Sequence, residues 1–182
     1  MKFFIGEWFA DNAIMRSYLD EVKFYSGTER RKMLKVSPNI GGSMLYGLTW
    51  RGYLAPGRTR TPSIYPKLWK TKVMDDYPEL EEIFREFGEI HFPAFKWSQT
   101  QLNKNFPCPP HKDSTNVGNS ILCCFGDYEG GNTIIDYGEK TGIQKFNGAK
   151  YPHWVEPIKS GTRYSLVFFT NTSIDRKKNI VK

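Results

Sequence analysis

The sequence predicts a mainly β protein with flanking helices, an α+β arrangement in which short strands build a sandwich, barrel or jelly roll. Two observations lead there. Six short strand-like segments separated by turn signals follow one another from residue 96 to residue 170, and two helical patterns precede them. At 182 residues the chain is most simply one domain, 1–182. We expect residues 1–95 to form a helical and loop support with a possible substrate lid, and residues 96–172 to form the jelly-roll core.

The first half of the chain predicts a strand at residues 2–5 and two helices. The first helix is capped by Asp11 and the segment ends at Gly27. Its apolar face, which we expect to brace the outside of the barrel, contains Ile14, Met15, Tyr18, Leu19 and Val22.

The second helix has a clearer signature. Its cap is predicted at Asp75 and Asp76, Pro78 lies in its first turn, and Gly88 is its stop. Its several glutamates favour a solvated face, the early ones well placed against the helix dipole, over a carboxylate site.

The predicted strands share short length and β-branched or aromatic content. They cover residues 96–102, 119–125, 132–137, 142–146, 153–158 and 163–170. The second is the most continuously apolar, which is typical of a strand buried on both faces. Asn147 and Gly148 predict a hairpin turn between the fourth and fifth strands.

Charge and composition narrow the class of protein. The chain has 26 Lys plus Arg against 19 Asp plus Glu, a net charge of +7, and a pI near 9.2. This excess favours polyanionic partners without identifying them. No apolar run approaches the roughly 18 residues of a membrane span. We expect a soluble intracellular protein, in the cytoplasm or nucleus, whose Cys108, Cys123 and Cys124 are reduced thiols.

Residues 51–72 are rich in proline and glycine, which predicts an ordered loop or lid. Arg58 and Arg60 alternate there with aromatic side chains, including Tyr65 and Trp69. That composition contacts phosphates and stacks on bases. The alternative is a surface loop whose aromatic residues attach it to the core.

A His-x-Asp pair, His111 and Asp113, is the centre of the chemistry. Side chains two apart on an extended chain point to the same side, so one segment supplies two metal ligands. The chain has three histidines in all. His91 ends a predicted helix, so His153 is the better third ligand. Two imidazoles and one carboxylate leave open positions on a metal, as in non-haem Fe(II) oxygenases. The alternative is a turn residue with its cap.

Arg163 and Ser165 share one face of the last predicted strand. A guanidinium in so apolar a strand needs a buried anion, and it can hold a carboxylate through two hydrogen bonds. The alternative is a salt bridge within the protein.

Together these residues resemble the Fe(II)- and 2-oxoglutarate-dependent dioxygenases, whose fold is a double-stranded β-helix, a cupin-like jelly roll. Asn103, Pro-Pro-His-Lys-Asp at 109–113, Asn116 and Gly-Asp-Tyr-Glu-Gly-Gly at 126–131 are similar to the TET/JBP branch. That branch oxidises the methyl group of 5-methylcytosine or thymine in nucleic acid. The resemblance covers residues 97–171.

The resemblance implies a role for each matched residue. His111, Asp113 and His153 would hold Fe(II), while Arg163, Ser165 and Asn103 would bind 2-oxoglutarate, which reacts with O₂ to hydroxylate the substrate. Asn116 would contact the target base. Asn171 stands where 5-methylcytosine oxidases have a histidine, which leaves the base open. Arg58, Arg60, Tyr65 and Trp69 would contact the nucleic acid, DNA rather than RNA.

The chain lacks the cysteine-rich extension of the animal enzymes, so the resemblance is to a minimal catalytic core such as a virus or microbe encodes. Two alternatives stay open. A prolyl or other protein hydroxylase would use the same iron and cosubstrate residues. A non-enzymatic jelly-roll binding module would need none of them.

Overall fold

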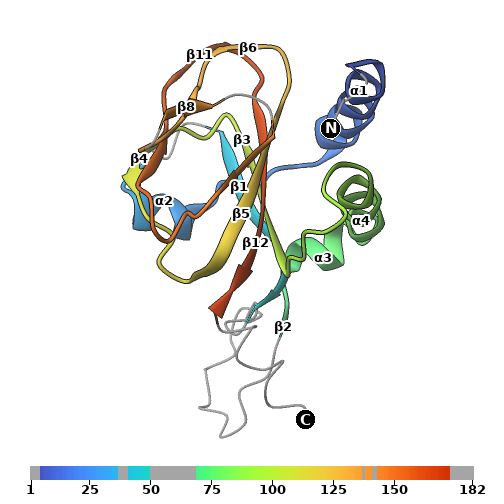
Figure 1. Cartoon of the computed structure of the whole chain (residues 1–182), viewed down its shortest axis with the longest axis horizontal. Coiled ribbons are helices and arrows are strands. Elements are labelled where there is room, and N and C mark those ends of the chain that lie inside the picture. Colours follow the sequence, from blue (N-terminus) through green and yellow to red (C-terminus); the bar gives the residue numbers. More distant parts are fainter. Residues whose placement is uncertain (1–4, 37–40, 50–68, 137, 141–142, 173–182) are drawn as a thin grey trace, which may run out of the picture.

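The computed structural model describes residues 5–36, 41–49, 69–136, 138–140 and 143–172. Within them, two antiparallel sheets curve around a common interior, with helices on the outside of the larger one (Figure 1). This is the arrangement of a jelly roll and confirms the predicted mainly β class with flanking helices. No helix in the described ranges is long and apolar enough to cross a membrane.

The large sheet contains six strands, and all its pairings are antiparallel. Its order is β2 (Trp69–Lys70), β1 (Gly42–Thr49), β3 (Gln99–Lys104), β12 (Tyr164–Asn171), β5 (Asn116–Phe125) and β9 (Gln144–Phe146).

The small sheet contains four strands in the order β4 (Cys108–His111), β10 (His153–Val155), β7 (Thr133–Ile135) and β8 (Gly138–Lys140). A separate two-stranded ribbon pairs β6 (Tyr128–Gly130) with β11 (Ile158–Gly161).

In the described ranges, four helices accompany the sheets: α1 (Ile5–Glu21), α2 (Thr28–Leu34), α3 (Lys72–Asp76) and α4 (Leu80–His91). As predicted, α1 lies against the outside of the large sheet, next to β5, and α4 lies on the same side (Figure 1). The short α2 lies apart from them, against β4 of the small sheet.

Side-chain alternation gives the large sheet two different faces. On the face toward α4, Leu102, Leu166 and Phe168 are fully buried. The Phe168 ring lies 5.1 Å from that of Phe92 and meets the Phe84 ring edge-on at 5.8 Å. Packing of this kind between aromatic rings adds to the stabilisation from apolar burial. The core therefore lies between this face and the helices.

Several local predictions differ from the structure. The first helix covers Ile5–Glu21, so Ile5 is helical and not part of the strand predicted at residues 2–5. Residues 2–4 lie outside the described residues. Gly27 adopts a left-handed conformation before α2, a helix that the pattern did not predict. Asp76 ends α3, so it does not cap α4.

Gly88 does not stop α4, which continues to His91. Gly88 is instead a position of close contact with another side chain. A Cβ on it would lie 2.3 Å from the Trp97 ring. Asn147 and Gly148 do form a turn, but it connects β9 and β10 of different sheets and is therefore not a hairpin.

Candidate active site

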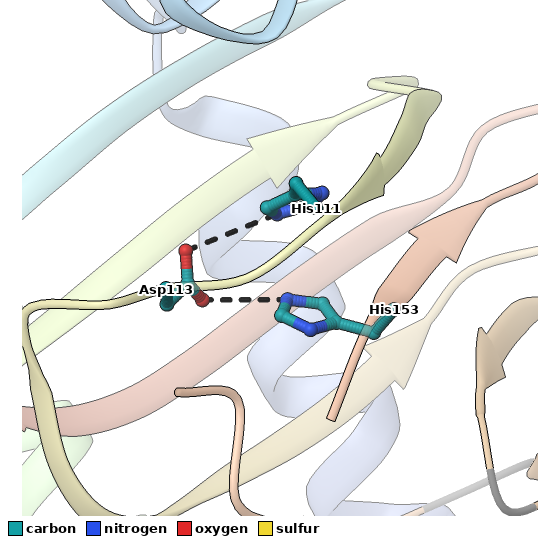
Figure 2. Close-up of side chains that lie close together, drawn as sticks. All are labelled: His111, Asp113 and His153. Atoms are coloured by element: carbon teal, nitrogen blue, oxygen red, sulfur yellow. Dashed lines mark ion pairs between the residues drawn. The ribbon is translucent and has the colours of Figure 1, made fainter. Parts of the chain in front are cut away.

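The His-x-Asp pair and His153 meet on the small sheet. His111 ends β4, Asp113 follows two residues later, and His153 begins β10. Because β4 and β10 are antiparallel neighbours, His111 and His153 are cross-strand partners. Figure 2 shows the Asp113 carboxylate near both imidazoles, with an ion pair drawn to each.

The geometry of these three side chains is close to that of a metal site. Asp113 Oδ1 lies 3.8 Å from His111 Nε2, and Asp113 Oδ2 lies 3.3 Å from His153 Nε2. One ligand atom from each residue lies within 4.8 Å of the others. Ligands about 2.1 Å from one ion and at right angles to each other are roughly 3 Å apart. A small inward movement therefore brings all three into coordination distance.

Backbone carbonyls orient both imidazoles. His111 Nδ1 lies 2.9 Å from the Pro109 carbonyl oxygen, and His153 Nδ1 lies 3.1 Å from that of Tyr151. An N–H donated from Nδ1 leaves the lone pair on Nε2 for a metal. Among the described residues His111 Nε2 is buried and has no hydrogen-bond partner.

The turn after β9 positions the carboxylate. Asp113 N–H donates to the Gly148 carbonyl at 2.9 Å. A Cβ on Gly148 would lie 3.3 Å from His153 Cε1 and 3.4 Å from Asp113 Oδ2, so this turn packs directly on two of the three candidate ligands.

Electrostatics favour the forms of His111 and Asp113 that can bind a metal. Burial lowers the pKa of His111, which keeps its imidazole neutral near pH 7. For Asp113, burial opposes ionisation, but the neighbouring His153 ring and the positive charge of Arg30 outweigh it and lower the pKa. A neutral imidazole and an ionised carboxylate are the states that bind a metal.

Arg163 is buried beside the same interior, with 1% of its surface exposed. Its Nη2 donates to Thr133 Oγ1 at 2.8 Å and to Cys124 Sγ at 3.1 Å. Its Nε and Nη1 are buried without a hydrogen-bond partner in the described structure. Gly131, at φ +65°, makes room for it, since a Cβ there would lie 2.8 Å from Arg163 Cδ. No protein salt bridge to Arg163 is found among the described residues, and its free N–H groups suit a carboxylate.

Asn103 and Ser165 lie opposite each other on β3 and β12. Asn103 Nδ2 donates to Ser165 Oγ at 3.3 Å, and Ser43 Oγ donates to Asn103 Oδ1 at 2.7 Å. Gln101 Nε2 donates to Ser43 Oγ at 3.0 Å. These buried polar groups form one connected network on the inner face of the large sheet.

A cavity of about 230 Å³ lies between the sheets and joins these groups. The triad lines it from the small sheet, and Asn103 and Ser165 line it from the large sheet. Arg163 is not in the wall, but its partner Thr133 is. The predicted iron ligands, Asn103 and Ser165 therefore surround one interior space, and Arg163 lies behind its wall at Thr133.

Asn116 and Asn171 also line the cavity and are cross-strand partners on β5 and β12. Asn116 Nδ2 donates to Ser120 Oγ at 3.4 Å, and Asn171 Nδ2 donates to Thr115 Oγ1 at 3.2 Å. A turn in which Asn116 N–H donates to the Asp113 carbonyl joins this pair to the triad.

The described structure does not test the other predicted substrate contacts. Arg58, Arg60 and Tyr65 lie outside the described residues. Trp69 pairs with Thr49 through its backbone at the edge of the large sheet, and its side chain is not described.

Sequence reasoning missed two residues of the site, Thr133 and Arg30. Thr133 is an unremarkable strand residue whose position beside Arg163 follows only from the tertiary fold. Arg30 lies in the run Arg30-Arg31-Lys32, which resembles any solvated basic stretch.

Comparison with known proteins gives likenesses in structure only. No family model and no curated protein matches the chain. NgTET1 in complex with 5mC DNA aligns with a TM-score of 0.49 and 16% identity over 84% of this chain and 74% of that one.

Two oxygenases give lower scores. A Pseudomonas putida prolyl-4-hydroxylase aligns with a TM-score of 0.38 and 14% identity over 87% and 84% of the two chains. A Burkholderia pseudomallei oxidoreductase of the 2OG-Fe(II) oxygenase family aligns at 0.41 and 15% over 88% and 93%. At these scores the function has to come from the chemistry of the site.

Proposed function

We propose that this protein is an Fe(II)- and 2-oxoglutarate-dependent dioxygenase that hydroxylates the 5-methyl group of a nucleic-acid base. The observation that supports the proposal most strongly is that a candidate metal site and a buried arginine lie beside the same space between the two sheets. Two oriented histidines and an aspartate converge on one side, and beside them lies a buried arginine with two donor atoms that have no partner among the described residues.

The residues present fit the cofactor and cosubstrate. A metal held by His111, Asp113 and His153 keeps positions open, as a 2-His-1-carboxylate site requires. When bound there, Fe(II) couples the oxidative decarboxylation of 2-oxoglutarate by O₂ to the hydroxylation of a substrate C–H bond.

The side chains of the protein would bind and orient the cosubstrate. Nε and Nη1 of Arg163 supply donors for the distal carboxylate of 2-oxoglutarate, and Ser165 adds a hydroxyl from the cavity wall. The aromatic packing behind the large sheet fixes the strand that follows Arg163. Such a rigid scaffold keeps the reacting groups aligned and excludes water from them.

Two features favour a nucleic-acid base as substrate. The cavity is small, so a base has to leave its stack to enter, and the amides of Asn116 and Asn171 then offer donors and acceptors to its edge. Positive and negative side chains are also distributed unevenly between the cavity and the outer helix. Arg30 lines the cavity, while exposed Glu82, Glu86 and Glu89 surround Arg85 on the outer helix α4.

Nucleoside mass spectrometry tests the proposal. DNA containing thymine and 5-methylcytosine is incubated with the protein, Fe(II), 2-oxoglutarate and O₂, beside His111→Ala and an Arg85→Ala control on α4. We expect a nucleoside heavier by one oxygen atom from the wild type and from Arg85→Ala, and none from His111→Ala.

Succinate formed by the wild type without an oxidised nucleoside would keep the dioxygenase and reject DNA as the substrate. RNA and a proline-containing peptide would then be assayed, the latter to test for a protein hydroxylase. No metal binding and no succinate would reject the enzyme and favour a binding module.

A further inference from the structure

Arg30 is a cation in the wall of the active-site cavity, and its charge acts on Asp113, although the described residues supply no ion pair to it. It comes from α2, which lies against β4, the strand that carries His111 (Figure 1). Its side chain lines the same cavity as the triad. Its Nε is buried without a hydrogen-bond partner, and no described residue forms an ion pair with it. Asp113 offsets part of the Arg30 charge, but the buried Nε donor is left without an acceptor in the described structure, so this position suits a further anion.

The neighbouring Arg31 shows that α2 is held in place by other means. Arg31 donates to the carbonyls of Ser26 and Gly41 and packs over the Phe106 ring, with its Cζ 4.9 Å from the ring centroid. Arg31 is 4% exposed and ties the helix to the fold. Arg30 is therefore not needed as a structural tie and is available to a ligand.

We propose that Arg30 binds a backbone phosphate of the nucleic-acid strand whose base enters the cavity. The inference rests on the proposed function, and it adds α2 to the binding surface. Under that function both carboxylates of 2-oxoglutarate already have partners, namely Arg163 and the metal. The remaining anion of the reaction is the phosphate of the substrate, which a guanidinium recognises through two hydrogen bonds.

The position of α2 supports a phosphate. Met33, also from α2, lines the same cavity but is 68% exposed, so the cavity reaches the surface there. Lys32 and Lys35 are exposed on the same short segment. A strand that places a base between the sheets would therefore meet a basic rim at α2.

The test measures the salt dependence of binding to oligonucleotides by fluorescence anisotropy. Arg30→Gln should weaken binding and reduce the slope of log K against log salt by about 0.7 for a single strand or about 0.9 for a duplex, as expected for one lost phosphate contact. Arg30→Lys should keep the slope, because it keeps the charge. Arg85→Gln, on the acidic outer helix, should match the wild type.

Cosubstrate binding is the second measurement. We expect Arg30→Gln to change the salt slope of nucleic-acid binding more than the KM for 2-oxoglutarate, which is followed by succinate formation without nucleic acid. A raised KM with an unaltered salt slope would overturn the proposal and assign Arg30 to the cosubstrate. Normal binding by the wild type with the same slope in Arg30→Gln would overturn the role of Arg30 alone. A wild type that binds no nucleic acid would overturn the substrate class as well.

Discussion

The two faces of the large sheet serve different purposes although the same strands build both. On β12, Leu166 and Phe168 enter the aromatic core, while Ser165, Val167 and Phe169 line the cavity. On β3, Leu102 faces the core, while Gln101 and Asn103 face the cavity. One face is dry and apolar, and the other carries amides and hydroxyls.

This difference shows how the protein tolerates a polar interior. The core side supplies the apolar burial that stabilises the sheet. The cavity side keeps its polar groups in a hydrogen-bonded network, which avoids the cost of unsatisfied burial. Because side chains alternate with period two, a one-residue slip in register would exchange the two faces, so the register that builds the core also places the site.

The largest expected effect is loss of metal binding on the cavity side. Asp113→Ala removes the only carboxylate of the triad and should reduce Mn(II) or Fe(II) affinity by more than about 100-fold. Thermal unfolding checks this. Metal at 100 times its Kd stabilises the wild type by about 2.7 kcal/mol and should leave Asp113→Ala unchanged. Equal stabilisation of both proteins would place the metal elsewhere.

Substitutions at two adjacent residues of β12 compare the core face with the cavity face directly. Leu166→Ala leaves a void among packed rings and should lower the free energy of unfolding by about 2–5 kcal/mol in urea denaturation. Ser165→Ala should cost only about 1 kcal/mol in stability, but should raise the KM for 2-oxoglutarate. A large stability loss in Ser165→Ala with no change in KM would contradict the division between the faces.

Substitution of Tyr46 should have the smallest effect on stability, because only its hydroxyl is polar and the rest of the side chain packs in the apolar core. Burial raises the pKa of Tyr46 from its ordinary value of 10.0 to about 12. The phenol of Tyr46 therefore loses its proton at a lower pH in the unfolded chain than in the folded one. The folded state is favoured fully below pH 10, and this contribution to the free energy of unfolding is lost as the pH rises to about 12. Tyr46→Phe should change stability at pH 7 by less than about 1 kcal/mol. It should also make the alkaline decline less steep in denaturation curves, and an unchanged decline would contradict this assignment.

The sequence predicted the site better than the elements that hold it. His111 and Asp113 are close in the chain, and the short list of histidines left His153 as their partner, so local pattern was enough. β4 escaped prediction because Pro109 and Pro110 argue against a strand, yet prolines are tolerated where β4 lies, at the edge of its sheet.

Other elements depend on distant parts of the chain. β1 pairs with β3, from Gly42 opposite Lys104 to Gly47 opposite Gln99, and no local pattern specifies such a pairing. α2 follows a glycine without a side-chain cap, so it lacked the usual start signal. Arg30 gained its position only through that helix.

The pairing of His111 with His153 across β4 and β10 has a further consequence for the edge of the small sheet. β4 is an edge strand, and its two prolines have no N–H to donate to a neighbour. A metal ion held between the two histidines would cross-link this weakly bonded strand to the rest of the sheet. Chelation would then do more than stop catalysis, because it would release an open edge to proteases and to pairing with other chains.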